Sequence, residues 1–322
     1  MSRKFYGRMV QRPMTENDNT RRQTPLQKAW EVFFPYLLYY LAYNAAYLIL
    51  LFVYQAVMQW VGAEGRQVMS AYAADAAGVM GGLGMLAGIL PLVPMLGREL
   101  GGRGETLRVM AGTAGGRSES DEGTEERRQA EDAAPGMTKL VDTKPQRRAV
   151  TALLTGLLAF SVSLGLNALF ELTGFAGSSQ TYQEVADRQY GVVFAAGLVL
   201  YGLISPLAEE VVFRGVIHNR LRRLYNPAIG ILASGLLFGA FHGNLVQGVY
   251  GACLGMLMAW LYERSGRFGT PLLFHAVANL TVYIMARLEG VQEILFTPAG
   301  CAALLVVSAG CVLAVHFGGR EE

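Results

Sequence analysis

Eight long apolar stretches run through the 322-residue chain and limit its fold more than any other feature. A helix needs about 20 mostly apolar residues to cross the hydrocarbon core of a bilayer. The stretches cover residues 33–58, 76–97, 149–170, a segment that starts near 191, 227–242, 245–262, 270–286 and 294–317. Because a helix satisfies its own backbone hydrogen bonds in lipid, we expect an all-α fold, a polytopic membrane bundle of about eight transmembrane helices.

The composition agrees with a membrane protein. Charged residues make up 16% of the chain, whereas a soluble domain usually has about a quarter. Cys253, Cys301 and Cys311 lie in apolar stretches without a CxxC spacing, so we expect them to be small buried side chains. The sequence has no P-loop, no GxGxxG and no nucleic-acid motif. We therefore expect membrane lipid around the chain, and no nucleic acid among its partners.

The distribution of Lys and Arg predicts the orientation of the helices. With eight spans, 24 of these residues fall on one side, in 1–29, 98–148, 214–223, 263–269 and the C-terminal tail. The other side has three, which are Arg66, Arg188 and Arg287. Positively charged connections favour the cytoplasm. The sequence therefore predicts a multi-pass protein of the cell membrane with both termini in the cytoplasm.

Four regions follow from these patterns. Residues 1–29 are expected to form a polar cytoplasmic tail, and residues 30–97 two N-terminal transmembrane helices. Residues 98–148 carry ten acidic and ten basic residues and few large apolar ones. Such a segment buries too little surface to fold alone, so a disordered cytoplasmic linker is expected. Residues 149–322 would form a six-helix core that carries the functional residues.

Two adjacent carboxylates, Glu209 and Glu210, continue the fourth apolar stretch. A charged group in hydrocarbon costs at least about 2–3 kcal/mol, so such residues usually serve a function. Glu210 and Arg214 are four residues apart and therefore share a helical face on which they can pair. Glu209 is rotated by about 100° from that face. We expect Glu210 mainly in the ion pair, which leaves Glu209 to take and give a proton.

A histidine in the next stretch lies at the same expected height. Asn226-Pro227 is a plausible turn between two antiparallel helices, and Glu210 and His242 each lie 16 residues from Asn226. Each arm would be about 24 Å long at about 1.5 Å per residue. The arm 215–225 carries several polar residues, so it is expected to project into the cytoplasm, with the site just below the membrane surface.

The seventh stretch adds His275 and Asn279, which are four residues apart and share a helical face. This helix is expected to enter from the cytoplasm near Thr270-Pro271, so His275 would lie only one or two turns deep. Three helices would then present polar side chains at one level, which predicts a joint functional site.

The residue types in this predicted site suit hydrolysis. Glu209 could activate water, His242 could share the proton or orient the water, and His275 with Asn279 could donate to an oxyanion. A second version places a divalent metal such as zinc on His242, His275 and Glu209. No HExxH motif is present, and the residues alone do not choose between the two versions.

Three motifs in order, EExxxR, FxxxH and HxxxN, resemble those of the CPBP family of intramembrane proteases. They read Glu209-Glu210…Arg214, Phe238…His242 and His275…Asn279, and the strong match covers about residues 190–285. The family includes type II CaaX prenyl endopeptidases and bacteriocin-processing or self-immunity proteins.

This resemblance implies endopeptidase activity at a site open to the cytoplasm. It implies that Glu209 acts as general base with His242, and that His275 and Asn279 surround the oxyanion. Glu210, Arg214 and Phe238 would then support the site structurally. The family has been described both as metal-dependent and as glutamate-based, so zinc stays an open alternative.

The leading interpretation is an endopeptidase that acts on a peptide or membrane-proximal protein at the cytoplasmic face. The main alternative is a non-catalytic membrane scaffold or a bacteriocin immunity protein of the same fold. A transporter would be expected to show broken helices in paired halves of its sequence, and no such repeat is present. The sequence predicts neither the substrate nor an oligomeric state.

Overall fold

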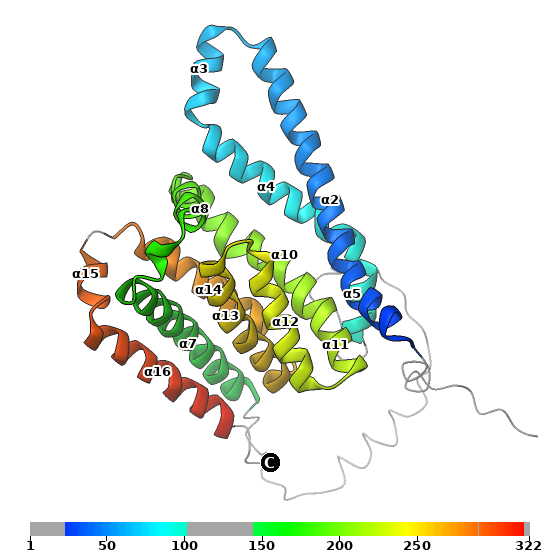
Figure 1. The fold of residues 1–322 in the computed structure, drawn as a ribbon, viewed down its shortest axis with the longest axis vertical. Helices are drawn as coiled ribbons and strands as arrows, with labels where there is room; N and C mark the ends of the chain where they lie inside the picture. The colour runs from blue at the N-terminus through cyan, green and yellow to red at the C-terminus, as the bar shows by residue number, and fades with distance from the viewer. Residues whose placement is uncertain (1–22, 102–143, 289, 319–322) are drawn as a thin grey trace, which may run out of the picture.

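The computed structural model describes residues 23–101, 144–288 and 290–318, and it is helical with no strand in these ranges (Figure 1). Six helices are long and apolar enough to cross a membrane, and two shorter apolar helices accompany them. The predicted all-α membrane bundle is therefore confirmed, and the chain is a multi-pass membrane protein. Each of the eight apolar stretches corresponds to one of these helices.

The helices in chain order begin with an N-terminal group: α2 (Pro25–Trp60), α3 (Ala63–Ala71), α4 (Ala73–Ile89), η1 (Leu90–Leu92) and α5 (Val93–Gly101). After the gap follow α7 (Lys144–Leu172), η2 (Ala176–Ser178) and α8 (Gln180–Tyr190). The fourth span consists of α9 (Phe194–Val199), η3 (Leu200–Ile204), α10 (Ser205–Glu210), η4 (Val211–His218) and α11 (Asn219–Leu224). The last group is α12 (Pro227–Phe241), α13 (Leu245–Ser265), α14 (Gly269–Met285), α15 (Val291–Leu295) and α16 (Pro298–Phe317).

The edges of two predicted regions differ from the structure. α2 begins at Pro25, inside the predicted polar tail, because Thr24 caps the helix and Gln27 completes a capping box. Both ends of the predicted linker 98–148 are helical, since α5 reaches Gly101 and α7 begins at Lys144. The prediction of disorder for the rest of the linker, residues 102–143, lies outside the described residues, as does most of the predicted tail.

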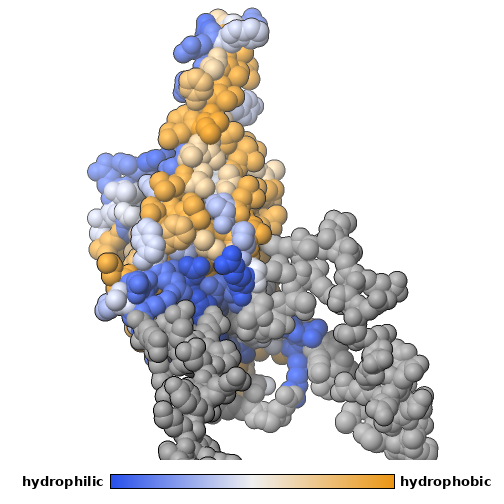
Figure 2. Space-filling model, turned by 90° about the vertical axis from the view of Figure 1, so that its right-hand side faces the viewer, coloured by the Kyte–Doolittle hydropathy of each residue, from blue (hydrophilic) through white to orange (hydrophobic). Residues whose placement is uncertain are grey.

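The helices form a core and a long hairpin. Figure 1 shows α7, α12, α13, α14 and α16 side by side in the core, while α2, α3 and α4 form a hairpin that extends beyond it. Glycines let α2 and α4 approach closely, since a Cβ at Gly88 would lie 2.8 Å from the Tyr39 ring. The hairpin surface is largely apolar (Figure 2), with Phe52 75% and Trp60 95% exposed. Such a surface suits contact with lipid.

The turn predicted at Asn226-Pro227 is confirmed. The Asn226 side chain accepts a hydrogen bond from the backbone N–H of Ile229 at 2.9 Å and caps α12, with Pro227 in the first helical turn. α12 then returns antiparallel to the preceding span and ends just before His242. Gly243 has φ of 72°, a conformation that glycine adopts readily, and it reverses the chain into α13.

Residues 215–225, which were predicted to project into the cytoplasm, pack against neighbouring helices, and their position relative to the membrane stays a prediction. Residues 211–219 are all buried, and η4 and α11 pack against α12, α2 and, in the case of η4, α5. Polar residues of this arm have partners from distant helices: His218 Nε2 lies 2.8 Å from Glu263, and Arg220 Nε lies 3.1 Å from Glu99. These pairings let a polar segment be buried, and they cannot be inferred from the arm alone.

The fourth span is not a regular α-helix. η3 and η4 are π-helical, with i→i+5 hydrogen bonds, and the short α-helical segment α10 lies between them. π-helical turns are rare and often occur at functional sites. α10 carries both Glu209 and Glu210, so the two carboxylates lie where the winding of the helix changes.

Candidate active site

Glu209 lies near the end of α10 and is 7% exposed. The Ser205 hydroxyl, one turn earlier on α10, donates a hydrogen bond to Glu209 Oε1. The other carboxylate oxygen, Oε2, lies 3.7 Å from His275 Nε2. The hydrogen bond from Ser205 holds the carboxylate in one orientation. Ser205 was missed in the sequence, where its only signal is a hydroxyl four residues before a carboxylate.

Glu210 and Arg214 form the predicted ion pair. Both side chains are fully buried, and Arg214 Nη1 lies 2.8 Å from Glu210 Oε1. Arg214 Nη2 donates to the backbone carbonyl of Gly255 at 2.9 Å, and its guanidinium lies 4.5 Å from the centre of the Phe238 ring. Residues from η4, α10, α12 and α13 thus surround one buried charge pair.

Glu210 also contacts His275, which was not predicted. His275 Nδ1 lies 2.9 Å from Glu210 Oε1, the oxygen that accepts from Arg214. If Glu210 is ionised beside Arg214, it can only accept, so His275 Nδ1 carries the hydrogen. The other ring nitrogen, Nε2, is then directed toward Glu209. One carboxylate therefore orients the histidine that faces its neighbour.

His242 follows the last residue of α12, and its ring is fixed in the same way. Nδ1 lies 2.9 Å from the carbonyl oxygen of Phe238, and a carbonyl only accepts, so Nδ1 donates and neutral His242 has its lone pair on Nε2. The Phe238 ring is nearly perpendicular to both histidines, with centroid distances of 5.1 Å to His242 and 5.5 Å to His275. Phe238 thus contacts both imidazoles and Arg214.

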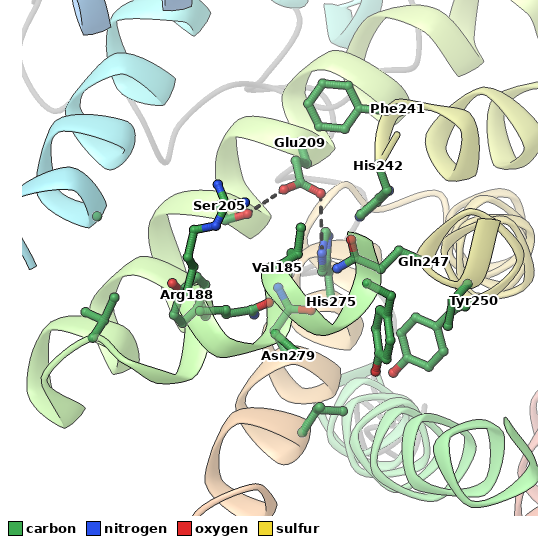
Figure 3. A pocket seen from close by; sticks show the side chains of 18 of the residues that line it. Val185, Arg188, Ser205, Glu209, Phe241, His242, Gln247, Tyr250, His275 and Asn279 are labelled. Carbon is green, nitrogen blue, oxygen red and sulfur yellow. Dashed lines mark hydrogen bonds and ion pairs between the residues drawn. The ribbon is translucent and has the colours of Figure 1, made fainter. Parts of the chain in front are cut away.

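All four predicted catalytic side chains line one cavity of about 670 Å³: Glu209, His242, His275 and Asn279 (Figure 3). They come from α10, from α14 and from the turn after α12. The structure therefore brings the polar side chains of the three predicted helices together in one cavity. The catalytic roles assigned to these residues stay predictions.

Elements that the motifs did not indicate also line the cavity. Tyr43 of α2, Gly78 of α4 and Phe170 of α7 contribute to the wall, as do several residues of α8. α8 is short and polar, and no motif in the sequence connects it with the carboxylates. Its position depends on tertiary packing, so only the structure reveals its contribution.

The side on which the cavity opens stays a prediction. Its lining includes Arg188 of α8 and Val192, and the charge count assigns Arg188 to the side opposite the cytoplasm. The predicted depth of the site below the cytoplasmic surface is likewise not tested, because the structure contains no membrane. The lining therefore favours access from the α8 side of the core.

The donor chemistry of the site is compatible with zinc, although the side chains are not grouped around one point in this structure. Two imidazole nitrogens and a carboxylate are typical zinc ligands. Among the described residues, however, no group of three His, Cys, Asp or Glu side chains is arranged to hold a metal ion. His242, His275 and Glu209 therefore do not form a preassembled metal site in this structure.

Comparisons with known proteins agree with the site. A family model described as type II CAAX prenyl endopeptidase Rce1-like matches residues 191–281, which include every residue of the three motifs. A protein of Bacillus subtilis (strain 168) named "Putative membrane peptidase YdiL" is 29% identical over 151 residues, covering 41% of this chain. The match spans 62% of that relative's length.

No solved structure matches the chain. The family match nevertheless includes Glu209, His242, His275 and Asn279, the four predicted catalytic residues that line the cavity. Residues 191–281 of the chain are thus similar to the type II CAAX prenyl endopeptidase Rce1-like family, and the chain is similar in part to a membrane peptidase.

Proposed function

We propose that this protein is a membrane endopeptidase in which Glu209 activates water to hydrolyse a peptide bond. Its substrate is a peptide or a membrane-proximal segment of a protein. The observation that carries this proposal is that Glu209, His242, His275 and Asn279 line one cavity. The family description and the name of the relative, both of which denote peptidases, support the same reaction class.

Glu209 is the general base. Its Oε1 is engaged by Ser205, so Oε2 accepts the proton from water. His242 presents Nε2 as an acceptor, because its Nδ1 is bound to the Phe238 carbonyl, and it holds the second hydrogen of the same water. General bases of this kind contribute about 10²–10⁴-fold to the rate.

Asn279 and His275 stabilise the oxyanion. The Asn279 amide lines the cavity and supplies an N–H donor. His275, in its imidazolium form, donates from Nε2, while Glu210 holds its Nδ1 at 2.9 Å. Donors that are fixed in position before the reaction stabilise a developing charge without reorganisation, which is the strongest contribution in many acyl-transfer enzymes.

The proposed step balances with one water molecule. The water oxygen bonds to the carbonyl carbon, its proton passes to Glu209, and the carbonyl π electrons move to the oxygen. When the tetrahedral intermediate collapses, the C–N bond breaks and the proton on Glu209 passes to the leaving nitrogen. The products are a carboxylic acid and an amine, and Glu209 is again a carboxylate.

We propose that both termini lie in the cytoplasm, because most Lys and Arg residues fall in the connections on that side. Two sources of substrate are consistent with the lining of the cavity: the bilayer beside the α2–α4 hairpin and the aqueous side near α8. We propose the α8 side as the entrance, because a polar helix lines that part of the cavity.

Purified protein reconstituted in lipid vesicles tests the proposal. A library of membrane-proximal peptides is offered to wild type, Glu209→Gln and Glu293→Gln, and products are identified by mass spectrometry. Glu293 is exposed on α15, so its substitution is a matched control. We expect cleavage by wild type and Glu293→Gln and a loss of at least about 100-fold in Glu209→Gln. Equal cleavage by all three proteins, or none by any, would reject the proposal.

A further inference from the structure

The cavity has one carboxylate and one permanent cation in its lining. Among the described residues that form its wall, Glu209 is the only Asp or Glu, and Arg188 is the only Lys or Arg. They come from different elements, α10 and α8. The titratable His275 lies 3.7 Å from Glu209, so Arg188 is the cation at the α8 side of the cavity.

Arg188 is available to a ligand. Its Nε donates to the Glu184 backbone carbonyl at 3.3 Å and its Nη2 lies 3.7 Å from Glu184 Oε2, and the Arg188 and Glu184 side chains are 78% and 53% exposed. Exposed pairs of this kind stabilise a protein little, so a better partner can replace Glu184. In Figure 3 the Arg188 side chain extends from α8 toward the polar site. Arg188 also lies outside the residues that the family model matches.

The two ends of the cavity carry opposite charges. A carboxylate near the buried Glu209 is repelled, whereas one near the exposed guanidinium of Arg188 is attracted. The planar guanidinium can bind a carboxylate through two parallel hydrogen bonds. Gln189 and Gln247 line the same cavity and add amide donors, while Phe170 and Val246 provide apolar surface. The lining thus suits an apolar peptide segment that bears one carboxylate.

From this arrangement we infer that Arg188 is a specificity-determining residue that binds a carboxylate of the peptide substrate. The inference rests on the proposed function for its assumption that the ligand is a peptide. The carboxylate is either the C-terminus of the peptide or an Asp or Glu side chain. In both cases the acidic group binds at the α8 side of the cavity, and the scissile bond lies nearer Glu209.

Binding of three matched fluorescent peptides to the full-length protein in lipid vesicles tests the inference. The peptides share one apolar sequence and end in a free acid, in an amide, or in an amide preceded by glutamate. We expect wild type to bind at least one acidic peptide about tenfold more tightly than the plain amide, as charge-assisted hydrogen bonds allow. Whether the free acid or the glutamate peptide is preferred identifies the source of the carboxylate.

Four variants sharpen the test. Arg188→Gln should abolish the preference and leave binding of the amide unchanged, while Arg188→Lys should retain part of it. Glu184→Gln removes the competing internal partner and should strengthen the preference. Arg66→Gln makes the same change in charge on α3, outside the residues that line the cavity, and should have no effect.

Three outcomes would overturn the inference. They are equal binding of acidic and amide peptides by wild type, an equal loss for all peptides in Arg188→Gln, and loss of the preference in Arg66→Gln as well. Cleavage is measured separately. If acidic peptides bind more tightly through Arg188 but no peptide is cleaved, the proposed function is rejected and the carboxylate site is retained. If peptides are cleaved but acidic peptides bind no more tightly than the amide, the carboxylate site is rejected and the proposed function is retained.

Discussion

Glu209 and Glu210 are neighbours in the sequence, yet they belong to two regions of different character. Glu210 is fully buried in a cluster with Arg214, Phe238 and the Gly255 carbonyl, which we call the buried cluster. Glu209 is 7% exposed and lines the cavity, where its fixed partner is the neutral Ser205 hydroxyl. Successive residues of a helix are rotated by about 100°, so Glu210 faces Arg214 whereas Glu209 faces the cavity, where it can reach a ligand.

The comparison suggests that Glu210 has a structural role and Glu209 a catalytic one. A buried carboxylate that is paired with Arg214 holds η4, α12 and α13 together and orients His275. A carboxylate that faces a cavity can exchange a proton with water. The two regions are connected through His275, which contacts Glu210 at Nδ1 and faces Glu209 at Nε2. The following predictions test whether the regions can be separated by experiment.

The largest effect on stability is expected from Arg214→Gln. The change leaves the Glu210 charge buried without its cation, and breaking one half of a buried pair typically costs about 3–5 kcal/mol. Thermal unfolding in detergent should show this loss. As a control, Arg222→Gln removes a more exposed cation of the same span, whose pair with Glu263 should contribute little. Similar unfolding temperatures for the two variants would contradict the importance of the buried cluster.

A smaller loss is expected from Gly255→Ala, which adds one methyl group to the buried cluster. A Cβ at this position would lie 3.0 Å from Phe238 Cδ1 and 3.2 Å from Arg214 Nη2. Overpacking of this kind usually costs about 1–3 kcal/mol. Gly156→Ala is the control, because no atom lies within 4 Å of a Cβ there. Equal unfolding temperatures of wild type and Gly255→Ala would show that the cluster has room to relax.

Ser205→Ala tests the role of the cavity around Glu209. Without the hydroxyl, Glu209 loses the hydrogen bond that orients it, so kcat should fall about tenfold, the equivalent of one hydrogen bond to a charged group. The unfolding temperature should change little, and Ser205→Thr should restore most of kcat because it keeps a hydroxyl. A fall in stability that matches the fall in activity would instead assign Ser205 a structural role.

The smallest effect is expected from a strong chelator. The proposed mechanism uses Glu209 and His242 to activate water, so kcat should stay within about twofold of its original value after metal removal. Residual metal is measured by elemental analysis in the same sample. Loss of activity that returns with added Zn²⁺ would favour the metal version on His242, His275 and Glu209.

Much of the fold could be predicted from sequence because hydrophobicity and motif spacing report local structure. The apolar stretches predicted eight helices, and the i,i+4 spacing predicted the Glu210–Arg214 pair. The equal distances of Glu210 and His242 from Asn226 predicted a common height, and His242 and the adjacent Glu209 line the same cavity. All of these inferences depend on helical geometry, which varies little from one protein to another.

Features that depend on contacts between distant segments could not be predicted. The packing of the arm 215–225 could not be predicted, because its polar residues pair with Glu263 and Glu99 of distant helices. The π-helical winding on both sides of α10 has no reliable signature in the sequence. The contribution of Arg188 to the cavity likewise depends on how α8 packs beside the core.

The most direct test of the central claim compares Glu209→Gln with Glu210→Gln, measuring peptide cleavage and thermal unfolding in the same preparations. We predict that Glu209→Gln loses at least about 100-fold in kcat/KM with an unfolding temperature near that of wild type. Glu210→Gln should lower the unfolding temperature by several degrees, because it leaves Arg214 buried without its anion. Activity lost in Glu210→Gln with unchanged stability, together with an active Glu209→Gln, would reverse the two roles and contradict the account.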